Sequence, residues 1–202
     1  VDGTSIDTWY DLSGLHTNAI AQGDSGVLTE NILNGLPVVR FSRTAGYTFN
    51  SSMVELRRPF TIVAVSRYNE DNVRGRFLQS DSSDFLVGHD ASRVGYRGRS
   101  RYVYRSSDPG GSARWDWRMY TATGGRNLNT FYLDGELMGT EDSDFSDVGS
   151  LVMGNDVGLR SYDSTVDLAE MLMFRRVLTD DEIKNLHTYL ASKWGLVHDT
   201  AT

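Results

Sequence analysis

The stretch Phe60-Thr61-Ile62-Val63-Ala64-Val65 decides the fold class, because it is apolar at successive positions along its length. Successive side chains of a β-strand point to opposite faces, so an apolar stretch of this kind predicts a strand inside a packed sheet. Other short runs rich in β-branched and aromatic residues recur between turn-forming residues, at 36–41, 85–88, 102–104, 115–120, 130–133, 151–154 and 168–174. Regular short strands of this kind indicate a sandwich or barrel and not βαβ units.

A tight hairpin is predicted at Leu133-Asp134-Gly135-Glu136-Leu137, where an Asp-Gly pair separates two strand-like runs. Both residues of this dipeptide accept the positive φ values that a two-residue hairpin turn requires. The 20 glycines of the chain fit a fold with many turns.

The C-terminal region predicts one helix. Thr179-Asp180-Asp181-Glu182 is a capping-box pattern, in which the Thr and Glu side chains bind free amides of the first turn. Ile183, Leu186, Leu190 and Trp194 follow at spacings of three and four residues, which gives one apolar stripe that packs on the sheets. Gly195 supplies a stop for this helix.

Composition excludes several classes of protein. The chain has 202 residues, no cysteine and a net charge of −7, and no apolar run approaches the roughly 20 residues that a membrane-spanning helix needs. The acidic balance argues against nucleic acid as a partner, and the missing cysteines exclude disulfides and thiolate sites. Without a linker-like segment, residues 1–202 are expected to form one domain of a longer protein. The first residues have no basic start and no apolar stretch, so a signal peptide is expected to be absent or already removed.

Several segments resemble laminin-G-like, concanavalin-A-like jelly-roll domains. They lie in the same order as in that family, at 9–14, 34–41, 60–65, 153–155, 168–174, 178–183 and 189–196. The resemblance implies an all-β fold of two antiparallel sheets, a jelly-roll sandwich closed by one short C-terminal α-helix. It also implies a non-catalytic module of a larger secreted or surface protein, with an extracellular location. Many members bind glycans or act in adhesion, and some hold a structural calcium ion.

The same broad fold includes glycoside hydrolases and polysaccharide lyases, which makes a polysaccharide-active enzyme an alternative. The glucanases carry a Glu-x-Asp-x-x-Glu strand, and the nearest match here places Asp167 and Glu170 on opposite faces of a strand. The Gln-x-His strand of the jelly-roll lyases does not occur in the sequence. His89-Asp90 is expected to lie in a loop as part of a turn. We therefore expect no catalytic residues.

The densest local feature is the arginine- and tyrosine-rich stretch from Arg93 to Arg105. Of the 20 basic residues in the chain, 18 are arginine, whose planar fork suits carboxylate and sulfate groups. Period-two alternation places Arg97, Arg99, Arg101 and Arg105 on one face of a strand or hairpin, and Tyr96, Tyr102 and Tyr104 on the other. Trp115 and Trp117 alternate together after it.

Arginine forks and flat aromatic rings together suit an anionic polysaccharide, so the candidate ligand-binding residues are Arg97, Arg99, Arg101, Tyr102, Trp115 and Trp117. Two other interpretations stay open: exposed arginines also protect an edge strand from pairing, and the aromatic side chains also suit a core. A third interpretation is a structural or protein–protein module, whose partners include other domains of the same parent chain.

Calcium is the possible cofactor, because hard cations take oxygen ligands from carboxylates. The candidate ligands are Asp11 and Glu170, at landmarks of the resemblance, with Asp156 and Asp167 in or beside a nearby loop. Asp11 has a second interpretation as a turn-capping aspartate, whose side chain binds local backbone amides.

Overall fold

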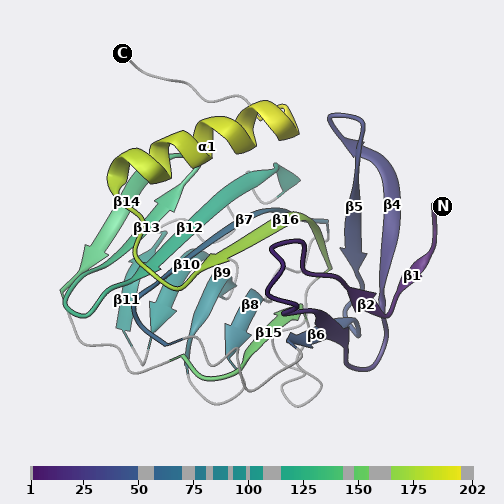
Figure 1. Cartoon of the computed structure of the whole chain (residues 1–202), viewed down its shortest axis with the longest axis horizontal. Helices are drawn as coiled ribbons and strands as arrows, with labels where there is room; N and C mark the ends of the chain where they lie inside the picture. The colour runs from purple at the N-terminus through teal and green to yellow at the C-terminus, as the bar shows by residue number, and fades with distance from the viewer. Residues whose placement is uncertain are drawn as a thin grey trace.

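The computed structural model describes residues 2–49, 57–69, 76–80, 84–90, 93–98, 101–106, 115–142, 148–154 and 165–196. Two eight-stranded sheets pack face to face in this part of the chain, and a helix covers the outer face of one of them (Figure 1). All paired strands are antiparallel. The predicted antiparallel jelly-roll sandwich is confirmed.

Sheet A carries the helix. Its strands lie in the order β1 (Ser5–Ile6), β4 (Gly26–Leu33), β5 (Leu36–Phe41), β16 (Val166–Phe174), β7 (Phe60–Tyr68), β12 (Arg118–Gly124), β13 (Asn129–Leu133) and β14 (Glu136–Glu141). The stretch Phe60–Val65 begins strand β7, which lies between β16 and β12. Its side chains are covered on both faces of the sheet, because Ile62 and Ala64 pack into the core between the sheets, whereas Val63 and Val65 pack towards the helix.

Sheet B faces sheet A across the core. Its order is β11 (Arg101–Arg105), β10 (Arg93–Gly98), β9 (Leu86–Asp90), β8 (Arg76–Ser80), β15 (Leu151–Gly154), β6 (Gly46–Phe49), β3 (Ala19–Ala21) and β2 (Thr8–Trp9). The hairpin β10–β11 forms one edge of this sheet, at the same end of the sandwich as β13 and β14.

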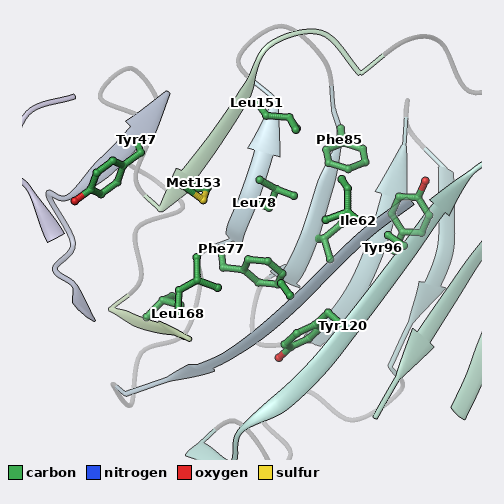
Figure 2. Packing of buried hydrophobic residues seen from close by; sticks show 14 of the residues in the cluster. Tyr47, Ile62, Phe77, Leu78, Phe85, Tyr96, Tyr120, Leu151, Met153 and Leu168 are labelled. Atoms are coloured by element: carbon green, nitrogen blue, oxygen red, sulfur yellow. The ribbon is translucent and has the colours of Figure 1, made fainter. Parts of the chain in front are cut away.

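The main core lies between the sheets and is rich in aromatic residues (Figure 2). Tyr96 and Tyr120 are fully buried there, with ring contacts to Phe131. A buried phenol needs a hydrogen-bond partner, and the Tyr96 hydroxyl donates to the carbonyl of Thr123 at 3.2 Å. Each such side chain contributes about 1.5–3 kcal/mol by leaving water.

A second apolar cluster lies between the outer face of sheet A and helix α1 (Asp180–Trp194). Ile183, Leu190 and Trp194 are buried, as the predicted stripe requires. The capping box at Thr179 and Glu182 is present in both directions, and Gly195 ends the helix in the left-handed conformation. The predicted helix is confirmed. It is too short and too polar to cross a membrane, and the described residues contain no helix that would.

The predicted hairpin joins β13 to β14, with Asp134 and Gly135 at φ values of 52° and 88°. A second hairpin of the same kind joins β4 to β5 at Asn34 and Gly35, with φ values of 49° and 72°. Both turns therefore use the backbone conformation that favours Gly, Asn and Asp.

Three local predictions are wrong. The strand predicted at 115–120 begins only at Arg118, so Trp115 and Trp117 do not alternate on a strand. His89 lies buried in β9, with its ring 4.1 Å from that of Tyr68, and not in a loop.

The third concerns β16, where Leu168 pairs with Ser66 and Glu170 with Val65, so that Ala169 has no partner in β7. This bulge breaks the alternation of side chains along β16. One extra residue in the strand moves every later side chain to the face opposite the one that strict alternation predicts. Asp167 and Glu170 therefore share the outer face of sheet A instead of lying on opposite faces.

Candidate functional site

The hairpin β10–β11 carries the densest set of arginine and tyrosine side chains, but a bulge rearranges its faces. Tyr96 lies opposite Tyr104, whereas Arg97 lies opposite Tyr102, so Val103 has no partner. Val103 and Tyr104 both pack against the core, and Tyr104 stacks on Phe131 at 5.7 Å. Tyr102 then turns outward.

The predicted separation of arginines and tyrosines onto two faces holds for Tyr96 and Tyr104, which face the core, but is wrong for Tyr102. Cross-strand partners share a face of the sheet, so Tyr102 accompanies Arg97 on the outer face of sheet B. The guanidinium carbons of Arg97 and Arg105 each lie 5.0 Å from the centre of the Tyr102 ring. We name Arg97, Tyr102 and Arg105 the hairpin cluster.

Among the described residues, the two arginines of the hairpin cluster have one carboxylate partner between them, the side chain of Asp84. Arg97 binds Asp84 at 2.6 Å, and Asp84 is shared with Arg76 at 3.8 Å. Arg105 has no carboxylate partner in the described part of the chain, where its guanidinium contacts the Tyr102 ring. A cation over an aromatic face is held in place while its N–H groups stay available to solvent.

Chemically, the hairpin cluster can bind an anion. Arginine presents parallel N–H donors that match the two oxygens of a carboxylate or sulfate group. Because Tyr102 orients Arg97 and Arg105 together, less side-chain entropy is lost when a ligand binds. Neighbouring Arg101 is mostly exposed and binds Glu141 of β14 at 3.2 Å.

The remaining predicted ligand residues that the structure describes, Trp115 and Trp117, lie outside the β10–β11 hairpin. Trp117 packs against the apolar cluster between sheet A and helix α1, and the guanidinium of Arg67 lies 4.9 Å from the centre of its ring. It therefore lies on the outer face of sheet A, on the opposite side of the sandwich. Trp115 lies in the segment before β12 and is 40% exposed. Arg99 lies outside the described residues.

Three of the four carboxylates predicted as calcium ligands, those of Asp11, Asp167 and Glu170, bind protein groups. Asp11 accepts hydrogen bonds from the amides of Ser13 at 2.7 Å and Thr17 at 3.0 Å, which is the turn-capping arrangement. The bonds from Ser13 hold the pKa of the Asp11 carboxyl below its usual value. Glu170 binds Lys193 of the helix at 2.9 Å.

Asp167 is fully buried and binds two arginines from neighbouring strands. Asp156, the fourth predicted ligand, lies outside the described residues. Within the described ranges, no three His, Asp or Glu side chains come close enough to hold a metal ion.

No protein-family profile matches the chain, and no curated protein matches it in sequence. In fold it is similar to the binding domain of Paraclostridial Mosquitocidal Protein 1, with a TM-score of 0.67 and 16% identity over 94% of this chain and 51% of that one. The receptor binding domain of botulinum neurotoxin mosaic serotype C/D gives a TM-score of 0.65 and 13% identity, over 93% of this chain and 49% of that one.

A third similar structure, the HCR/D F1240A mutant, gives a TM-score of 0.69 and 13% identity over 94% of this chain and 50% of that one. This chain therefore spans about half the length of these solved structures. At such identities the likeness establishes the β-sandwich fold.

Proposed function

We propose that this chain is a non-catalytic module that binds an anionic polysaccharide through the hairpin cluster on the outer face of sheet B. The observation that carries the proposal is the pair of guanidiniums held against the Tyr102 ring, of which Arg105 has no carboxylate partner among the described residues. Uronate and sulfate groups present the oxygen pairs that such donors bind.

The fold supports a binding role. Two of the similar structures are the binding domain of Paraclostridial Mosquitocidal Protein 1 and the receptor binding domain of botulinum neurotoxin mosaic serotype C/D. A secreted or surface location fits this role, as it fits the laminin-G-like resemblance of the sequence. On this proposal, the chain is one domain of a larger protein and presents the hairpin as a recognition surface.

Affinity electrophoresis tests the proposal. The protein is run through gels that contain a neutral, a uronate or a sulfated polysaccharide, and we expect retardation in one of the anionic gels alone. Arg105→Gln removes the guanidinium and should abolish most of the retardation. Arg43→Gln, an exposed arginine in the turn between β5 and β6, is the matched control and should migrate as the parent does. Equal retardation of both variants would contradict the assignment of the hairpin cluster as the polysaccharide site.

The same gels test two further parts of the proposal. Runs with calcium and with chelator show whether a cation contributes, as the resemblance suggests. The length of the recovered polysaccharide should stay unchanged, whereas a hydrolase or lyase would shorten it.

A protein–protein module is the second candidate function, and one loop favours it. Tyr10, Leu12 and Leu15 are large apolar side chains with exposed fractions of 68%, 96% and 62%. The hydrogen bonds of Asp11 hold this loop in shape, so the apolar side chains are presented without further ordering. Sedimentation velocity over a range of concentrations tests self-association, and Leu12→Ser should abolish it.

A further inference from the structure

We propose a second binding site, for one neutral sugar ring, in a pocket between the β12–β13 turn and the start of helix α1. The pocket has a volume of about 320 Å³ and opens on the outer face of sheet A. This volume lies at the lower end of the range of small-ligand sites. Sheet A and the core lie between the pocket and the hairpin cluster, so the pocket is a separate site.

The floor and walls of the pocket are apolar. Leu178 and Ile183 are buried at its floor, while Leu128 and Val177 line it with exposed fractions of 51% and 39%. Exposure of large aliphatic side chains to water raises the free energy of the protein, and a ligand with an apolar face removes this cost by covering them. The C–H face of a pyranose ring is such a surface.

Polar groups at the pocket match the hydroxyls of a sugar. The Tyr132 hydroxyl donates to Asp180 Oδ1 at 3.2 Å, while Asp180 Oδ2 has no hydrogen-bond partner among the described residues. Burial and the neighbouring Asp180 raise the pKa of Tyr132, so the phenol stays a donor at neutral pH. A carboxylate oxygen beside a phenol accepts the hydroxyl of a ligand as a charge-assisted hydrogen bond.

The turn that forms the other wall adds Arg126 and Asn127. Both are exposed, and neither side chain bonds another described residue. The Asn127 amide offers two donors and an acceptor, which is the mixed character that binds sugar hydroxyls.

The shape of the pocket is fixed before any ligand binds. The amide of Gly125 donates to the carbonyl of Leu128 at 3.0 Å, and a Cβ at Gly125 would lie 2.4 Å from that oxygen. Only glycine allows this close approach, so the backbone of the turn is fixed before a ligand binds and does not have to be ordered on binding.

A neutral ring fits better than an ionic ligand. Asp180 and Arg126 place one charge of each sign at the pocket, so neither an anion nor a cation is favoured overall. A purely apolar ligand would leave the Asp180 carboxylate without a partner on its desolvated side, which is costly.

Amide NMR spectra recorded during titration with glucose, galactose, mannose and N-acetylglucosamine test the proposal. We expect at least one sugar to shift the amides of Arg126, Asn127 and Asp180. Asp180→Asn should weaken that sugar by about tenfold, because a charge-assisted hydrogen bond becomes a neutral one. Asp181→Asn, which removes the same charge one residue later and outside the pocket lining, is the matched control and should bind within about twofold of the parent.

Asp180→Asn could weaken binding by disturbing the start of helix α1. Asn127→Ala changes the opposite wall of the pocket and leaves the helix intact, so weaker sugar binding by this variant as well would locate the site in the pocket. Arg105→Gln should bind the neutral sugar as the parent does, which separates this site from the hairpin cluster. If none of the four sugars shifts these amides, or if Asp180→Asn and Asn127→Ala both bind as tightly as the parent, the proposal is wrong.

Discussion

Asp167 and Arg40 form a bidentate pair across β16 and β5, with Nε bonded to Oδ1 at 2.7 Å and Nη2 to Oδ2 at 2.9 Å. Arg67 and Asn69, from β7 and the residue after it, bind the same carboxylate at 3.0 and 2.9 Å. One buried side chain thus connects three adjacent strands of sheet A. The hydrogen bond to Asp167 raises the pKa of the Arg40 guanidinium, which therefore stays charged at every pH at which the protein is studied.

Removing this carboxylate should destabilise the fold. Asp167→Ala leaves two arginines and an amide without their partner, and breaking such a buried pair costs about 3 kcal/mol. The value is at the lower end because Arg40 and Arg67 are 40% and 27% exposed and can recover water. Urea unfolding measures the difference. Arg40→Gln should cost less, and equal stability of Asp167→Ala and the parent would contradict the account.

The helix cap should also contribute measurably. Thr179→Ala removes the side-chain acceptor of the Glu182 amide and should cost about 1 kcal/mol in thermal or urea unfolding. Thr188→Ala is the matched control, because that hydroxyl only bonds back to the carbonyl of Lys184 within the helix. A control variant as destabilised as the cap variant would show that the cap has no special role.

Glu182 should titrate at unusually low pH. Hydrogen bonds from Arg176, and then from the amide of Thr179, lower the pKa of Glu182 from 4.5 to about 2. Because the folded pKa is depressed, the stabilising contribution is complete above pH 4.5 and disappears as the pH falls towards 2. Carboxyl-carbon NMR titration measures it. In Arg176→Gln the pKa should rise towards its ordinary value, and an unchanged pKa would exclude Arg176 as the main cause.

Ionic strength should weaken polysaccharide binding at the hairpin cluster. Arg105 is exposed and Arg97 is partly exposed, so added salt screens their attraction for an anionic chain. Retardation in anionic gels should therefore fall steadily with added sodium chloride. Retardation that does not depend on salt would indicate contacts with sugar hydroxyls alone.

Local patterns predicted much of the fold. The apolar stretch Phe60–Val65, the Asp134–Gly135 turn and the capping box at Thr179 each act through near neighbours in sequence, and each is confirmed. The Asn34–Gly35 turn carries the same dipeptide chemistry and was predictable by the same rule.

The bulges were not predictable, and they decide the candidate site. Nothing in the side chains of Val103 or Ala169 marks an extra residue, because a bulge depends on the pairing of two strands. Strict alternation therefore placed Tyr102 on the wrong face. Trp117 was equally suited to a core or a surface by sequence, and its place under helix α1 depends on contacts far along the chain.

Mapping the ligand on the protein tests the central claim most directly. Amide NMR spectra are recorded during titration with sulfated and uronate oligosaccharides. We predict that one of them shifts the amides of Arg97, Tyr102 and Arg105 and leaves those of the β12–β13 turn unchanged. If neither oligosaccharide shifts the hairpin amides, or if the shifts fall only on other parts of the surface, the assignment of the hairpin cluster as the polysaccharide site is wrong.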